Sequence, residues 1–123
     1  MIVVAKVIIG IVALIHIYIL WVEMCAWTTT GRKVFRNFPK NLFVSTKQMA
    51  ANQGLYNGFL ATGLIWSFFI DSPQWSVNIA LYFLCCVTVA GIYGAISLSK
   101  KIFIVQSIPA LIGVIFWSIV KFS

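Results

Sequence analysis

Four apolar stretches separated by polar connectors run along this chain. They cover about residues 2–27, 48–70, 76–98 and 102–120. Each is long enough to cross the hydrocarbon core of a bilayer as a helix, which takes about 20 predominantly apolar residues. One long connector and two short ones join them, so consecutive helices are expected to be antiparallel neighbours. The pattern predicts an all-α fold, an integral membrane four-helix up-and-down bundle that forms a single transmembrane domain over residues 1–123.

Glycine and proline mark where the predicted helices stop or bend. The long connector, residues 28–47, contains Gly31 and Pro39 as helix breakers. Pro73 ends the short turn after the second stretch, because proline cannot continue the helix that precedes it. Pro109 lies near the middle of the fourth stretch, where it predicts a kink.

The composition supports a membrane location. Hydrophobic residues make up 62% of the chain and charged residues only 9%, too few to cover the surface of a soluble protein of this size. The net charge of +7 does not indicate nucleic acid, because the basic residues lie in connectors between apolar stretches and form no continuous face.

The placement of the basic residues predicts the orientation in the membrane. Seven of the nine Lys and Arg residues lie in residues 28–47 and at Lys100–Lys101, and the other two are Lys6 and Lys121. Cytoplasmic loops collect Lys and Arg, and the two basic connectors fall on one side only if there are four spans. We therefore expect a multi-pass membrane protein with residues 28–47 as its basic cytoplasmic loop and both termini outside the cytoplasm.

The basic loop also predicts a contact with lipid. Its charges alternate with phenylalanine and other apolar residues, as in a segment that lies along the headgroups with its apolar side toward the membrane. The expected partners are anionic headgroups at Arg32, Lys33, Arg36 and Lys40. A loop that only fixes the topology is an equally good interpretation of the same residues.

The second apolar stretch contains an unusual group of polar side chains between Ala50 and Thr62. Lipid offers such groups no hydrogen bonds, so they are expected to face protein or water. A stripe of small residues, Gly54, Gly58 and Thr62, is expected to let a neighbouring helix pack closely beside them. Polar residues of the third and fourth stretches fall at a similar depth, in the cytoplasmic half. The predicted ligand-binding residues are Asn52, Gln53, Tyr56, Asn57, Tyr93 and Gln106.

Glu23 and His16 are the candidate catalytic residues, two helical turns apart on nearly the same face of the first stretch. A carboxyl group inside a membrane is costly unless it is paired, protonated or hydrated, which makes Glu23 a candidate functional residue. Two other interpretations stay open. Glu23 pairs with Arg32 or Lys33 at the headgroups, or His16 only donates a hydrogen bond within the core.

The cysteines give no sign of a metal site. Cys25, Cys85 and Cys86 all lie in apolar stretches, and their spacing resembles no zinc motif. They are expected to be buried as small hydrophobic side chains. A single histidine without other strong ligands also argues against bound metal or haem. The sequence names no cofactor.

Two blocks of sequence resemble a known family. The first joins His16, Glu23-Met24, Trp27-Thr28-Thr29 and Gly31-Arg32-Lys33-Val34-Phe35, and the second is Ala51-Asn52-Gln53-Gly54-Leu55-Tyr56-Asn57-Gly58-Phe59-Leu60-Ala61. Together they resemble small four-span bacterial membrane proteins, the domain-of-unknown-function 1304 family. The resemblance covers almost the whole chain. It implies a small four-helix inner-membrane protein and carries over no activity.

These observations favour a polar intramembrane site that binds or transforms a small amphipathic, lipid-like molecule. Two alternatives remain: a non-catalytic accessory membrane subunit whose polar layer holds helices together, and a proton-coupled exporter of small molecules. The exporter fits less well, because Glu23 lies near one end of its helix. The sequence does not decide whether the protein is an enzyme or whether it forms a homo-oligomer.

Overall fold

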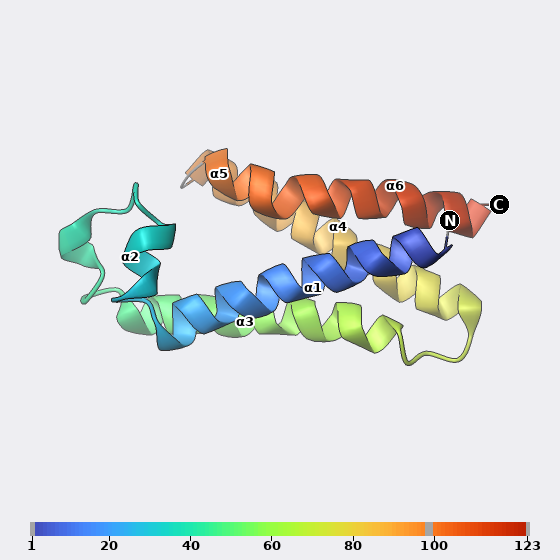
Figure 1. Cartoon of the computed structure of the whole chain (residues 1–123), viewed down its shortest axis with the longest axis horizontal. Helices are drawn as coiled ribbons and strands as arrows, with labels where there is room; N and C mark the ends of the chain where they lie inside the picture. Colours follow the sequence, from blue (N-terminus) through green and yellow to red (C-terminus); the bar gives the residue numbers. More distant parts are fainter. Residues whose placement is uncertain (1, 98–99, 123) are drawn as a thin grey trace.

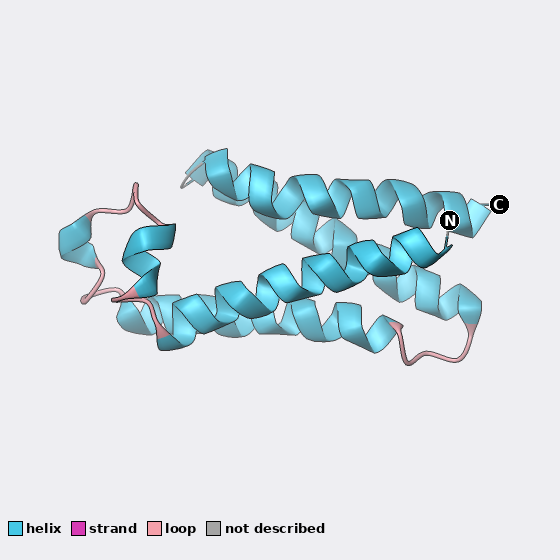
Figure 2. Ribbon diagram, in the orientation of Figure 1, coloured by secondary structure: helices cyan, strands magenta, loops and turns pink. Residues whose placement is uncertain are grey.

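The computed structural model describes residues 2–97 and 100–122, and every regular element in this part of the chain is a helix. The prediction of an all-α fold is confirmed (Figure 2). The long helices are α1 (Ile2–Cys25), α3 (Lys47–Ser67) and α4 (Pro73–Ser97). A fourth long segment consists of α5 (Lys100–Ile102), the π-helix η2 (Phe103–Ser107) and α6 (Ile108–Phe122). Two short elements, α2 (Thr30–Val34) and the 3-10 helix η1 (Lys40–Leu42), lie between α1 and α3.

The four long segments lie side by side and alternate in direction (Figure 1). α1 packs against α3 and α6, and α4 packs against the same two helices. α4 crosses the molecule obliquely, from the end of α3 to α5 (Figure 1). The α1–α3 pair and the α4–α6 pair therefore diverge at the end where α2 lies. The two termini and the α3–α4 turn lie at the opposite end (Figure 1).

Three helices are long and apolar enough to cross a membrane: α1, α4 and the segment Lys100–Phe122. α3 has 21 residues, which gives about 30 Å of helix and is long enough to cross. Its amide-bearing first half makes it less apolar than the other three. Length and hydropathy thus select three helices, where the sequence pattern predicted four spans.

The end of the molecule that holds the termini is packed with apolar side chains. Ile9, Leu64 and Leu84 are fully buried there, each from a different helix. Trp117 of α6 is also buried, and its Nε1–H donates a hydrogen bond to the Ala5 carbonyl at 3.0 Å. This bond satisfies the indole N–H inside an apolar environment. It fixes α6 beside the first turns of α1.

Two glycines permit close contacts between the helices. A Cβ atom on Gly54 would lie 2.7 Å from Met24 Cγ and 3.2 Å from the Leu20 carbonyl oxygen, so only glycine lets α1 come this near to α3. A Cβ on Gly91 would lie 2.9 Å from the Ser107 backbone nitrogen. Of the predicted stripe of small residues, Gly54 and Gly58 pack against α1, where Gly58 meets Leu20. Thr62 is exposed.

Residues 28–46 fold into a compact cap over the diverging end of the helices. Trp27 contacts the rings of Phe35, Phe38 and Phe43, and Phe43 is fully buried. The Trp27 indole N–H donates to Thr46 Oγ1 at 3.0 Å. The phenylalanines thus pack on the tryptophan and on one another within the cap.

Arg32 stabilises this cap from within. Its Nε–H donates to the Thr28 carbonyl at 2.7 Å and an Nη–H donates to the Lys40 carbonyl at 3.0 Å. The guanidinium carbon also lies 5.0 Å from the centre of the Phe43 ring, a cation–π distance. Arg36 also donates to the cap, through its Nε–H to the Lys33 carbonyl, so two of the four predicted headgroup cations are bonded to the cap itself.

The helix ends differ slightly from the predicted spans. α1 stops at Cys25, α3 stops at Ser67, and α4 starts at Pro73, where a proline is well accommodated in the first turn of a helix. The predicted end of the third span, Leu98, lies outside the described residues, as do Met1 and Ser123. The irregularity expected near Pro109 takes the form of η2, because proline has no N–H for the carbonyl four residues earlier.

Candidate functional site

A cavity of about 840 Å³ lies beneath the cap, between α1 and the α5–η2 segment. Its α1 wall is formed by Leu14, Ile15, Tyr18 and Ile19, and its other wall by Ile102 and Val105. The cap closes it with Phe35 and Phe38. Its volume is within the range of about 300–1,000 Å³ that is typical of small-molecule sites. The cavity exists because the two helix pairs diverge at this end of the molecule.

Glu23 supplies a buried carboxyl group to this cavity. Only 7% of the residue is exposed, and its Oε1 accepts a hydrogen bond from Asn57 Nδ2 at 2.6 Å. The close approach of α1 at Gly54, one turn before Asn57, brings the two side chains together. The alternative pairing with Arg32 is not found, since Arg32 donates to backbone carbonyls of the cap.

His16 is fully buried and has partners for both ring nitrogens. Nδ1 lies 2.8 Å from the Val12 carbonyl oxygen, and Nε2 lies 2.9 Å from Gln106 Nε2. A carbonyl can only accept, so Nδ1 carries the proton, and Nε2 accepts from the amide. This arrangement describes a neutral imidazole. His16 does not line the cavity, but Gln106 does, so the histidine reaches the cavity through that amide.

A second polar contact lies behind η2. Ser107 Oγ donates to the Thr88 carbonyl at 2.8 Å, and Thr88 Oγ1 donates to the Leu84 carbonyl at 2.8 Å. Both residues are buried. Ser107 packs against Gly91, so the π-helical turn is held against α4 on one side while it presents Gln106 to α1 on the other.

Four of the predicted ligand-binding residues are exposed and lie outside the cavity: Asn52, Gln53, Tyr56 and Tyr93. Asn52 and Tyr56 are two residues from Gly54 in either direction, about 200° around the helix from the face that packs on α1. Tyr93 is two residues after Gly91, which packs on Ser107, so it also lies about 200° around its helix from the packed face. The expectation that these side chains face the interior is wrong, because the glycines determine which face is covered. Asn57 and Gln106 are buried as expected.

Two cavity residues were not recognised from the sequence as part of a site. Arg36 of the cap and Lys101 of α5 both line the cavity. Lys101 Nζ also donates to the Val34 carbonyl at 3.2 Å, a bond between α5 and α2. The sequence predicted Arg36 only as a contact for anionic headgroups and Lys101 only as part of the charge bias, because nothing local indicates that residues 65 positions apart line one cavity.

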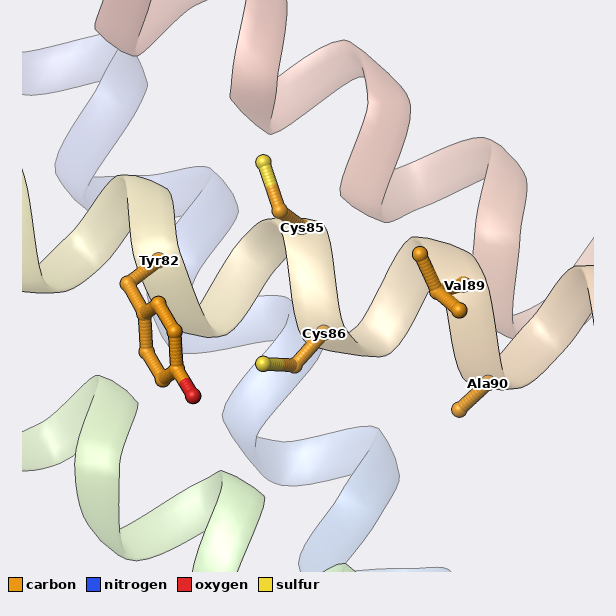
Figure 3. Close-up of a pocket in the computed structure, with 5 residues that line it drawn as sticks. All are labelled: Tyr82, Cys85, Cys86, Val89 and Ala90. Atoms are coloured by element: carbon orange, nitrogen blue, oxygen red, sulfur yellow. The ribbon is translucent and has the colours of Figure 1, made fainter.

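The thiols are more exposed than predicted. Cys25 and Cys85 are exposed and Cys86 is partly buried. Cys85 and Cys86 line a shallow depression on the outer face of α4 together with Tyr82, Val89 and Ala90 (Figure 3). The two thiols point in different directions from the helix, as neighbouring positions must.

Comparison with known proteins places the chain in a family. The model of the family described as "Protein of unknown function (DUF1304)" matches residues 10–118. The chain belongs to the DUF1304 family. It is also 33% identical over 107 residues to "Uncharacterized protein YpaA" of Lactococcus lactis subsp. lactis (strain IL1403), and the match covers 85% of this chain and 88% of that protein. No solved structure matches the chain.

The DUF1304 match contains the complete candidate site. Residues 10–118 extend from the first wall residue, Leu14, through Glu23 and the cap to Gln106. The cavity is therefore built wholly from the part of the chain that the family covers. The predicted membership of this family is confirmed.

Proposed function

We propose that this protein binds a small amphipathic, lipid-like molecule in the cavity between α1 and α5–η2. The observation that supports this is the composition of the cavity wall: apolar side chains along both helices, with Glu23 and Gln106 as polar groups among them. A predominantly apolar pocket with a few convergent polar groups is the usual form of a small-molecule site. Glu23 lies between its apolar part and the cap.

The proposed setting is the bacterial inner membrane, crossed four times, with both termini outside the cytoplasm. α1 ends beside the cap and α4 begins at the opposite end, so if α1 and α4 cross the membrane, α3 has to carry the chain back across it. Seven basic residues lie at the cap end and two at the end with the termini. This distribution supports a cytoplasmic cap.

Binding is a better proposal than catalysis for this cavity. Of the two candidate catalytic residues, Glu23 lines it and His16 does not. Glu23 is thus the group that would exchange a proton with a ligand, while His16 positions Gln106. An exporter would need a path to the other side of the membrane. Ile9, Leu64 and Leu84 belong to one buried apolar cluster to which α1, α3, α4 and α6 all contribute, which argues against a path.

Two substitutions on α1 test the proposal. Ile19 lines the cavity, whereas Ile17 on the same helix is exposed outside it. We expect the wild-type protein, extracted in mild detergent and measured by native mass spectrometry, to carry an amphipathic molecule. Ile19→Trp should remove it by filling the cavity, and the matched Ile17→Trp should retain it. A wild-type protein without any such molecule, even after incubation with lipid extract, would contradict the proposal.

A second candidate function is a non-catalytic accessory subunit. The observation in its favour is that each of the two buried polar contacts joins two helices, α1 to α3 through Glu23–Asn57 and α1 to η2 through His16–Gln106. Hydrogen bonds of this kind hold membrane helices together. Under this alternative, Glu23→Gln leaves every measured property of the purified protein unchanged. Under the first proposal, it alters ligand retention while the protein stays folded.

A further inference from the structure

We propose that the ligand of this cavity is an acidic amphiphile. Its phosphate or carboxylate head would lie between Arg36 and Lys101, and its acyl chain would follow the apolar wall of α1. This inference rests on the proposed function and specifies the chemical class of the ligand. Its basis is the charge balance at one end of the molecule, the position of two cations on one rim, and the exposure of the cavity wall.

The cap end of the molecule has a large excess of positive charge. Seven basic residues lie there, and the chain contains only two acidic residues, Glu23 and Asp71. Asp71 lies in the turn at the opposite end, and the carboxyl group of Glu23 is bonded to Asn57. Positive charge therefore exceeds negative charge at this end by at least six. An anionic ligand bound there would reduce this excess.

Only two of these seven cations line the cavity, and they belong to separate segments. Arg36 follows α2 in the cap, and Lys101 belongs to α5. The bond from Lys101 to the Val34 carbonyl brings the two segments together at 3.2 Å. Arg36 donates its Nε–H to the Lys33 carbonyl at 3.2 Å, and a guanidinium has five N–H donors in a plane suited to phosphate and carboxylate oxygens. The rim thus combines the planar set of N–H donors of Arg36 with the single positive charge of the Lys101 ammonium group.

The cavity wall indicates where an acyl chain would lie. Leu14, Tyr18 and Val105 line the cavity, yet they are 66%, 49% and 38% exposed. Because these side chains line the cavity and are also exposed on the outside of the molecule, they mark a lateral opening between α1 and η2. In the proposed topology this opening faces the lipid of the cytoplasmic leaflet, so an amphiphile can enter without leaving the membrane. On α1 the residues that line the cavity extend from Leu14 to Glu23, about 14 Å along the helix axis.

The position of Glu23 determines the orientation that the amphiphile would take in the cavity. Its carboxyl group lies between the apolar wall and the rim, among residues that contain no buried cation. A negatively charged head at that depth would lack a counter-ion. The acidic head is therefore favoured at Arg36 and Lys101. The acyl chain is favoured along the apolar wall, on the other side of Glu23.

A lipid titration tests the inference. The wild-type protein is purified in a neutral detergent, stripped of lipid, and titrated with dioleoyl phosphatidylglycerol, dioleoyl phosphatidylcholine or oleate, and binding is followed by native mass spectrometry. We expect phosphatidylglycerol or oleate to bind more tightly than phosphatidylcholine. The double variant Arg36→Gln/Lys101→Gln should weaken that binding by about tenfold. Lys33→Gln/Lys40→Gln removes the same charge outside the cavity and should change it little.

Each result decides the inference. A stronger response to phosphatidylglycerol identifies a phospholipid head, and a stronger response to oleate identifies a fatty acid. Equal binding of phosphatidylcholine, or equal loss in the two double variants, overturns the acidic-head site, while sensitivity to Ile19→Trp would still support the cavity. Absence of all three ligands contradicts the proposed function as well. Because Lys101 also bonds the cap, Arg36→Gln alone is measured in parallel, and it should weaken binding in the same direction.

Discussion

At the scale of single residues, the contact between Glu23 and Asn57 joins α1 to α3 beside the cavity. The amide donates to the carboxyl oxygen at 2.6 Å, and both residues are less than a tenth exposed. A buried acceptor that loses its donor has no water to replace it, so the loss costs more than the bond itself contributes. The pair is therefore sensitive to truncation on either side and tolerant of a substitution that keeps an acceptor oxygen.

A set of variants at this contact should show the difference. Glu23→Ala leaves the Asn57 amide unpaired and should lower the free energy of unfolding in detergent by about 1–3 kcal/mol. Glu23→Gln keeps an oxygen that accepts from Asn57 and should cost much less. In a double-mutant cycle with Asn57→Ala, the coupling should be about 0.5–2 kcal/mol. Strictly additive effects would mean that the two side chains do not interact.

Gly91 offers a second test at this scale. A Cβ at this position meets the Ser107 side chain and lies 2.9 Å from its backbone nitrogen, so Gly91→Ala should force α4 and η2 apart. We expect a loss of about 1–3 kcal/mol in thermal or denaturant unfolding, as for other overpacked sites. The matched control is Gly10→Ala, where a Cβ has nothing within 4 Å and helix propensity improves. Equal effects at both positions would contradict the close contact.

At the scale of the elements, the cap and the π-helix position the site. The cap is held by the aromatic cluster around Trp27 and by the bonds of Arg32 to two carbonyls. The extra width of the π-helical turn lets Gln106 reach His16 while Ser107 reaches the Thr88 carbonyl. π-helical turns are often found at functional sites, and here the turn forms part of the cavity wall.

Loss of Trp27 should loosen the cap. Trp27→Ala removes three ring contacts and the bond to Thr46, so it should loosen the backbone of the cap and let trypsin cleave at its Lys and Arg residues, whose side chains are already exposed. We expect cleavage after Lys33, Arg36 or Lys40 to become at least several-fold faster, followed by mass spectrometry of the fragments. Trp66→Ala, at a residue that is 53% exposed on α3, is the control and should leave the cleavage rate unchanged. An equally fast cleavage in both variants would argue against a Trp27-based cap.

At the scale of the whole molecule, the arrangement of the helices and the distribution of charge agree. Both termini lie at one end, and the α2–η1 cap and α5 lie at the other with seven basic residues. An even number of crossings places the termini on the same side of a membrane, and an odd number places them on opposite sides. The location of the termini therefore tests the role of α3, which hydropathy alone does not select as a span.

Reporter fusions measure this directly. A phosphatase that is active only outside the cytoplasm should be active when fused after residue 123 and when inserted at the α3–α4 turn near Asp71. A fluorescent protein that matures only in the cytoplasm should be active when inserted into the cap near Asn37. A phosphatase that is inactive at both positions, together with an active fluorescent protein in the cap, would indicate three crossings without α3, and the expected location of the C-terminus would then be wrong.

The sequence by itself determined the secondary structure and the charge asymmetry. Helices form through bonds between residues four positions apart, so apolar runs, Pro73 and the glycines indicate them locally. The hydrogen-bond partners of the buried polar groups, by contrast, could not be predicted from local patterns. His16 meets Gln106 across 90 positions, and the glycines at 54 and 91 turn Asn52, Tyr56 and Tyr93 outward.

Only the tertiary structure decided which face of each helix is covered and where the helices separate. Periodicity gives the angles between side chains on one helix, but it does not give the rotation of that helix against its neighbours. That rotation follows from the close contacts at Gly54 and Gly91. The oblique path of α4 then opens the cavity, which Arg36 and Lys101 both line. The cavity and its rim are thus consequences of packing between distant segments, which no local pattern contains.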